Sequence, residues 1–388
     1  MQPASKEAVV AATRSARIAA RRALRAVALA GTRLAGLLGG VLAASHAQGA
    51  DLPEDRADLM FHSYNGGGVS ANGPALLVRK SVTEAVSLSA SYYVDMVSNA
   101  SIDVVTTASP YKETREEHAG SLDFVYKDAL ISLAADASKE PDYSANRASI
   151  DVAQDLWGGM TTVNLGYTRG WDTVGNHNDP SFSQQANHWQ YRLGATQILT
   201  ARWLMSANVE AISDQGYLGS PYRAALVFGA RVKEIDPSTR TSRAIALRSV
   251  LGLGDDGALH AQYRYFWDTW AIRARTVELG YSKNIERRWL LDGTLRYYSQ
   301  GHASFYSDDF TSAVVYRSRN RQLGSFHDLG LGVKASWTAL QEPGRYEVKL
   351  NAALDHMSFH YSDFTDIRTG GLYSFNANVL ELYVSANF

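Results

Sequence analysis

Hydrophobic and polar residues alternate with a period of two in many stretches of this chain. The last such stretch ends the chain, and its apolar face carries Leu380, Leu382, Val384 and Phe388. Such alternation is typical of a strand that lies between an apolar and a wet environment. No segment after residue 50 is apolar for the length of a membrane-spanning helix. A membrane form of this chain would therefore have to be a closed sheet, which satisfies every backbone hydrogen bond.

The alternating stretches predict sixteen strands, an even number that single-chain bacterial barrels require. We expect them at residues 57–65, 73–81, 85–97, 115–126, 129–138, 146–155, 160–172, 187–198, 202–213, 241–252, 257–268, 270–283, 288–300, 324–337, 344–359 and 375–388. Fourteen strands is the alternative, because the first hairpin around 65–68 is ambiguous. The stretch 222–233 could be an additional hairpin inside a loop.

Short predicted connections alternate with long polar ones along the chain. The long ones are expected at residues 98–114, 139–145, 173–186, 214–240, 301–323 and 360–373. A soluble sandwich would share the alternating strands, but it has no reason to keep this order of connections. The fold class that we predict is all-β, a single closed antiparallel transmembrane β-barrel with short periplasmic turns and long extracellular loops.

The first 47 residues have the layout of a secretory signal peptide. A basic leader precedes an apolar run from Leu34 to Ala44, and Ser45-His46-Ala47 then places small residues around one variable position. The apolar run is too short to span a bilayer, so it indicates export. We expect residues 1–47 to be cleaved and residues 48–388 to form a barrel in the bacterial outer membrane.

Composition excludes several classes of function. The formal net charge of -1 provides no basic field for nucleic acid, and the absence of cysteine excludes disulfides, cysteine zinc sites and thiol catalysis. We predict no cofactor and no metal site. Two sets of residues could bind a cation, although hydrated loops are the simpler interpretation of both. They are His356 and His360 with Asp355, Asp363 and Asp366, and Asp308-Asp309 with Asp268 and Asp103.

Charged residues fall on the polar face of the predicted strands. An Arg or Lys on the lipid face would cost about 2 to 4 kcal/mol at mid-membrane, so a position facing the lumen is expected. The charges either pair and hold the wall together, or line a pore and set its selectivity. A sixteen-stranded interior is wide enough for water unless loops such as 98–114 fold into it. The candidate lumen-lining residues are Asp95, Asp136, Arg192, Glu210, Arg264, Glu278, Asp292, Arg296, Lys334, Glu347 and Lys349.

Several segments resemble a family of proteobacterial outer-membrane β-barrel proteins described only as a domain of unknown function. The most specific are Tyr92–Ser98, Ser220-Pro221-Tyr222-Arg223, Tyr263–Trp270 and Phe305-Tyr306-Ser307-Asp308. The resemblance implies one outer-membrane barrel and no particular activity. It also implies a small lipoprotein or a periplasmic redox protein as a partner, besides outer-membrane lipid.

The last strand also resembles the terminal recognition strand of Gram-negative outer-membrane barrels. The resemblance implies that Leu380, Leu382, Val384 and the terminal Phe388 form an assembly signal, which the barrel assembly machinery reads. The chain would then be inserted by that machinery after export.

Three functions remain open. The first is a porin-like channel for small solutes or ions. The second is a scaffold or sheath for a redox or lipoprotein partner, and the absence of a haem-binding cysteine pair means that any electron carrier must be another chain. The third is a membrane-embedded hydrolase that uses His260 or His188 with a nearby serine. We expect no enzyme, because His188 has no serine at a convincing offset and His260 is expected to point inward.

Overall fold

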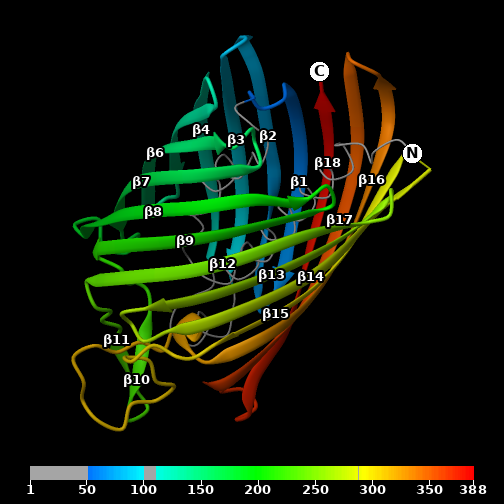
Figure 1. Cartoon of the computed structure of the whole chain (residues 1–388). Coiled ribbons are helices and arrows are strands. Elements are labelled where there is room, and N and C mark those ends of the chain that lie inside the picture. The colour runs from blue at the N-terminus through cyan, green and yellow to red at the C-terminus, as the bar shows by residue number, and fades with distance from the viewer. Residues whose placement is uncertain (1–50, 100–110, 287) are drawn as a thin grey trace.

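The computed structural model describes residues 51–99, 111–286 and 288–388, which form a closed barrel of sixteen antiparallel strands (Figure 1). The expected signal peptide, residues 1–47, lies outside the described residues. The barrel strands are β1 Arg56–Gly66, β2 Val69–Thr83, β3 Val86–Asn99, β4 Tyr111–Tyr126, β5 Ala129–Lys139, β6 Tyr143–Leu156, β7 Thr161–Gly175, β8 Ser183–Thr200, β9 Trp203–Gly216, β12 Thr239–Leu253, β13 Gly257–Asp268, β14 Arg273–Ile285, β15 Trp289–Gln300, β16 Phe326–Glu342, β17 Tyr346–Thr365 and β18 Leu372–Asn387.

The predicted strand number is confirmed, and the fourteen-strand alternative is wrong. Each barrel strand pairs with its neighbours in the chain, and β1 pairs with β18 to close the sheet, with Arg56 opposite Asn387. The ambiguous stretch after β9 forms a separate hairpin of β10 Ala224–Val227 and β11 Ala230–Lys233. The first hairpin turns at Gly67 and Gly68, whose positive φ angles of 60° and 79° suit glycine.

Several strands continue further towards the loop end than the sequence predicted. β17 runs to Thr365, β6 begins at Tyr143 and β8 begins at Ser183. The expected loops 139–145, 173–186 and 360–373 are therefore wrong in length, and only 140–142, 176–182 and 366–371 lie between the strands. The reason is that the ladder of backbone hydrogen bonds does not depend on apolar side chains, so strands extend past the apolar stretch.

The outer surface of the barrel is an apolar band. In β12 the outward side chains run from Leu253 to Ile245, and Arg243 follows them. In β17 they run from Tyr346 to Leu354, and His356 follows. Nine residues cover about 30 Å of strand, or about 23 Å of bilayer at the usual tilt of transmembrane strands. The outward stripes therefore match the thickness of a membrane.

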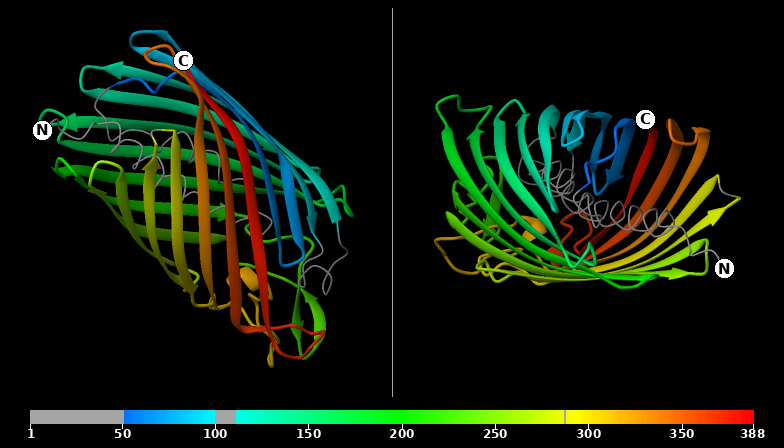
Figure 2. Two further views of the ribbon diagram at one scale, coloured as in Figure 1. Left: turned by 90° about the vertical axis from the view of Figure 1, so that its right-hand side faces the viewer. Right: turned by 45° about the horizontal axis from the view of Figure 1, so that its top comes forward.

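One end of the barrel carries the long connections and the other carries short turns (Figure 1). The longest connections are 217–238, which contains β10 and β11, and 301–325, which contains the short helix η2, Arg321–Leu323. Figure 2 shows η2 enclosed by the curve of the strands rather than projecting outside. Among the described residues, no helix has the length and apolarity to cross a bilayer.

Candidate functional site: the interior of the barrel

The candidate lumen-lining residues all lie on the inner face of the wall. Each occupies a strand position between outward-facing neighbours, as Glu278 does between Val277 and Leu279. The structure brings these residues together in three groups that differ in their exposure to solvent. Most of them lie close to an opposite charge on the same strand, on the next strand or on the strand beyond it, so the inner wall carries mixed charge in close pairs.

The first group is a buried ionic network on β1 to β6. His62 Nε2 lies 2.6 Å from Asp95 Oδ1, and Arg115 Nη2 donates to Glu117 Oε2 at 2.9 Å. Arg115 Nη1 lies 4.0 Å from Asp95 Oδ2. The side chains of Asp95 and Glu117 have no exposed surface, and Arg115 is 2% exposed. The network continues through Arg147, which bonds to both Glu117 and Asp136.

The second group is in contact with solvent although it faces inward. Arg192 donates to Asp151 at 2.7 Å, and Arg264 lies 3.4 Å from Glu210. The side chains in these two pairs are 22% to 28% exposed. Near the short-turn end of β17, Lys349 Nζ lies 2.5 Å from Glu347 Oε2, with exposures of 34% and 24%. Because these side chains point into the barrel, their exposure indicates that water reaches the interior.

The third group lies on β14 to β16 and is largely buried. Glu278 is directly opposite Arg296 across the β14–β15 pair, and Arg296 Nη1 donates to Asp328 Oδ1 at 2.5 Å. Asp292 is opposite Lys334 across the β15–β16 pair. Lys334 Nζ also lies 5.5 Å from the centre of the Tyr383 ring. Charge pairs that are largely buried stabilise this part of the wall.

An aromatic cluster fills the interior near the loop end, and sequence reasoning missed it. We call it the mouth cluster. Phe359 and Phe375 stack with ring centres 4.5 Å apart, and Phe305 from the 301–325 connection packs against Trp270 at 4.9 Å. The most buried aromatic members on the wall include Tyr64, Phe326, Phe359, Tyr361, Phe364 and Tyr373. The connection between β15 and β16 therefore folds onto the inner face.

The sequence contained a signal for this cluster. In β17 the apolar residues lie at even positions up to Leu354, and beyond it they lie at Met357, Phe359 and Tyr361. The change of phase transfers the apolar side chains from the outer to the inner face without interrupting the strand. β18 shows the same change around Val379. The sequence analysis named loop 98–114 as one that could fold into the interior. Most of this loop lies outside the described residues.

The β15–β16 connection is fixed at both of its flanks. Phe310 exchanges backbone hydrogen bonds with the β10–β11 hairpin, and Arg317 pairs with Ile235 in the same way. Arg319 donates to Glu234 through its backbone N–H and to Thr365 through its guanidinium. Arg321 is fully buried, with its guanidinium carbon 5.1 Å from the Phe375 ring centre. These contacts hold the connection inside the mouth.

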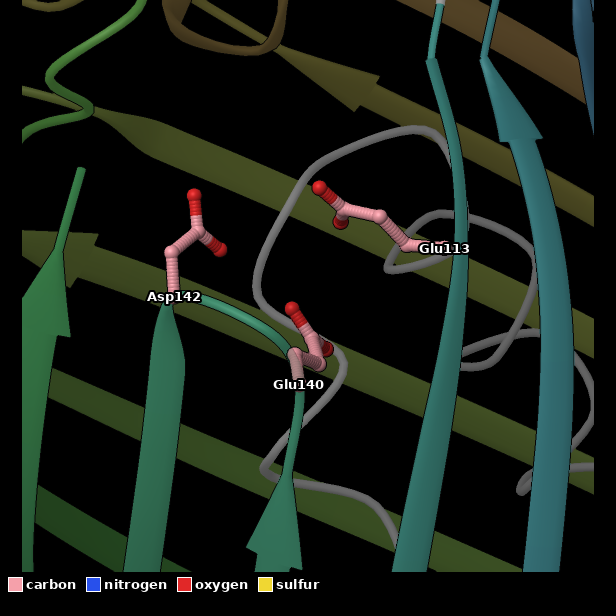
Figure 3. Close-up of side chains that lie close together, drawn as sticks. All are labelled: Glu113, Glu140 and Asp142. Atoms are coloured by element: carbon pink, nitrogen blue, oxygen red, sulfur yellow. The ribbon is translucent and has the colours of Figure 1, made fainter. Parts of the chain in front are cut away.

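Three carboxylates meet at the loop end of β4 and β5 (Figure 3). Glu113, Glu140 and Asp142 each offer an oxygen within 4.8 Å of the others. The Tyr222 hydroxyl donates to Asp142. Burial, together with the negative charge of Glu113 and Asp142, raises the pKa of Glu140 to about 7. Three oxygens suit a hard cation but fall short of the six to eight that calcium takes, so the group is more simply a proton-binding cluster.

The raised pKa of Glu140 predicts a pH-dependent stability. Because the folded state binds the proton more tightly than the unfolded chain, the free energy of unfolding falls as pH rises from about 4.5 to about 7. We expect Glu140→Gln to be more stable than the wild type at about pH 8, by up to about 3 kcal/mol, and to match it near pH 4. Urea unfolding in detergent micelles at both pH values measures the difference. Glu116→Gln, which removes an exposed carboxylate from β4, should show no such gain.

Among the described residues, neither of the two candidate cation sites is assembled. His356 Nδ1 lies 2.8 Å from Asn378 Oδ1, whereas the His360 ring stacks on His327. Their expected acidic neighbours are engaged elsewhere, Asp363 with His302 and Asp366 with Arg368. In the second set, Asp308 pairs with Arg319 and Asp268 with Arg240, and Asp103 is outside the described residues.

Neither histidine of the hydrolase hypothesis is arranged as a catalytic base. His260 Nε2 lies 2.8 Å from Ser282 Oγ, and the same hydroxyl donates to Asp292. The serine thus lies between histidine and carboxylate, whereas an activated serine requires the histidine in the middle. His188 lies between Asp172 at 2.8 Å and Asp214 at 2.7 Å, so both of its ring nitrogens are engaged by carboxylates.

The residues of the expected assembly signal lie along the closing strand. Leu380, Leu382, Val384 and Phe388 are all outward and exposed. The Phe388 backbone N–H donates to Asp55 O, and Lys80 Nζ lies 5.0 Å from the Phe388 ring centre. The terminal residue is therefore fixed at the seam where β18 meets β1. Its role in assembly stays a prediction, which an insertion assay with the purified assembly machinery would check.

Several solved structures are similar to this chain, with little sequence identity. A bacterial polysaccharide outer membrane secretin is 9% identical with a TM-score of 0.49, covering 87% of this chain and 100% of that one. OpdK from Pseudomonas aeruginosa, solved with vanillate, is 12% identical with a TM-score of 0.43, covering 86% and 100%. The siderophore receptor PirA from Pseudomonas aeruginosa is 9% identical with a TM-score of 0.43, covering 81% of this chain and 60% of the receptor. These similarities carry no inference about a substrate.

The family assignment comes from the sequence. No curated protein matches the chain. A family model described as "Protein of unknown function (DUF3570)" matches residues 99–352, from the end of β3 into β17. The closed antiparallel barrel, its apolar outer band and its short turns at one end are the features of a bacterial outer-membrane protein. The chain therefore belongs to the DUF3570 family and is an outer-membrane β-barrel.

Proposed function

We propose that this barrel is a channel for small polar or charged solutes across the outer membrane. The observation that supports it is the exposure of inward-facing charges: Arg192, Glu210 and Arg264 point into the barrel and contact solvent. Barrels of sixteen strands are wide enough to enclose water. A charged side chain that keeps its hydration inside a barrel favours a wet passage over a filled core.

The charge pairing favours weak selectivity between cations and anions. Arg192 lies against Asp151 and Arg264 against Glu210, so neither sign dominates this wall. A pore selects strongly when its lining carries one sign of charge. The proposed channel would therefore accept small solutes of either sign.

The mouth cluster would make the passage narrow at the loop end. The 301–325 connection covers the inner aromatic side chains there, and Arg321 and Phe364 have no exposed surface. A solute would have to pass beside this connection. We therefore expect a conductance below that of an unobstructed barrel with the same number of strands.

Single-channel recording in planar bilayers tests the proposal. We expect the purified, refolded protein to produce discrete conductance steps with little preference for potassium or chloride. Arg192→Glu, which makes the local charge negative, should shift the reversal potential towards cation selectivity under a salt gradient. Stable insertion without current at any voltage would contradict the proposal.

The scaffold hypothesis stays a prediction. It requires a lipoprotein or a periplasmic redox protein that remains bound when the barrel is purified in mild detergent. Co-purification of such a partner in fixed proportion, from a barrel that is silent in planar bilayers, would favour a scaffold over a channel.

A further inference from the structure

Three arginines on the lipid side of the barrel form a compact basic patch. Arg243 on β12 is directly opposite Trp267 on β13, and Trp267 is directly opposite Arg273 on β14. Arg275 is the next outward residue on β14 and faces Tyr265. Strand spacing places the Cα atoms of Arg243 and Arg273 about 10 Å apart, and those of Arg273 and Arg275 about 7 Å apart. The three side chains are exposed and flank aromatic rings.

These arginines lie at one edge of the apolar band. On β12 the outward apolar series ends at Ile245, and Arg243 follows. On β14 it ends at Val277, and Arg275 and Arg273 follow. Both edges are at the end that carries the long connections, which is the extracellular end of an outer-membrane barrel. The patch therefore lies at the level of the head groups of the outer leaflet.

The patch makes no compensating interaction within the described part of the chain. Arg243, Arg273 and Arg275 have no ion pair and no side-chain hydrogen bond to any described residue. The outward positions of β9, β12, β13, β14 and β15 carry no carboxylate. By contrast, Arg169 on the outer face of β7 donates to Asn187 and stacks on Trp189 at 4.0 Å. Three unpaired positive charges at a lipid interface would attract an anionic ligand.

We propose that Arg243, Arg273 and Arg275 bind the phosphates of lipid A in the outer leaflet. Guanidinium groups form paired hydrogen bonds with phosphate, and three of them within reach of each other suit a ligand that carries two phosphates. Trp267 and Tyr265 present ring surfaces between the arginines at the level where sugar and acyl chain meet. The site is independent of the channel proposal, because it faces the lipid and not the lumen.

Native mass spectrometry of the folded protein in detergent, titrated with bisphosphorylated lipid A, tests the site. We expect the wild type to bind it, and the triple variant Arg243→Gln, Arg273→Gln, Arg275→Gln to bind on the order of 100-fold more weakly, at about 5-fold per arginine. The wild type should bind dephosphorylated lipid A as weakly as the triple variant binds bisphosphorylated lipid A. Binding by the triple variant within about 2-fold of the wild type would overturn the proposal.

Two controls keep the result specific. The charge-matched variant Arg202→Gln, Arg288→Gln, Arg345→Gln removes three exposed arginines from the short turns at the opposite end, and it should bind lipid A as the wild type does. Heat-dependent mobility in gels establishes that each variant is folded. Phosphatidylglycerol that binds as tightly as lipid A, and is lost equally in the triple variant, would overturn the assignment to lipid A.

Discussion

Replacing residues 302–324 with a two-residue turn is expected to raise single-channel conductance several-fold, because it removes the connection that occupies the mouth. The deletion is compatible with the fold, since Gln300 and Phe326 are direct partners in the β15–β16 pair. A tight turn can therefore join the two strands, as in other hairpins. Planar bilayer recordings of wild type and deletion variant under the same salt measure the change.

A matched deletion separates obstruction from a general effect of loop loss. The 176–182 connection lies at the same end of the barrel, but contributes no residue to the mouth cluster. Shortening it should leave the conductance near the wild-type value. An equal conductance in the wild type and the 302–324 variant would mean that the connection does not obstruct the passage.

The second large effect is expected from Arg115→Met, which should lower the free energy of unfolding by about 3 to 5 kcal/mol. Arg115 is 2% exposed and lies between Asp95 and Glu117, neither of which has exposed surface. Removing the guanidinium leaves both carboxylates buried with fewer positive charges near them. Equilibrium unfolding in urea, followed by tryptophan fluorescence in detergent, measures the loss.

Arg192→Met provides the control. Arg192 also bonds to a carboxylate at 2.7 Å, but the two side chains are 25% and 23% exposed. Solvent-exposed ion pairs contribute about 0 to 1 kcal/mol, so this change should be nearly neutral. If both variants lost the same stability, the burial of the β3–β4 network would not be the cause.

The period of two, together with the alternation of short and long connections, was sufficient to predict the architecture. The outward stripe that ends at Phe388 and the inward polar positions of β14 and β15 follow directly from that period. The ends of the strands were harder to predict. A strand that leaves the membrane keeps its backbone hydrogen bonds, whereas its outward side chains change from apolar to polar. β17 was therefore expected to end at residue 359, and it runs to Thr365.

The contacts inside the barrel could be predicted only in part. Asp95 was recognised as inward from its own strand, but its closeness to Arg115 depends on the β3–β4 register, in which the two residues are opposite each other. The contact of His62 with Asp95 joins β1 to β3 across β2. Neither relation can be found from spacing along the chain, because register is set by pairing between strands.

Hydration of the inner wall is uneven around the circumference. Asp95 and Glu117 on β3 and β4 are sealed from solvent, whereas Arg192 and Glu210 on β8 and β9 contact it. Any aqueous route through the barrel would consequently follow the exposed charges of β8, β9 and β13 and avoid the buried charge pairs of β3–β4 and of β14 to β16. The hydrated part of the wall would then line the route of the solute, and the buried part would stabilise the barrel.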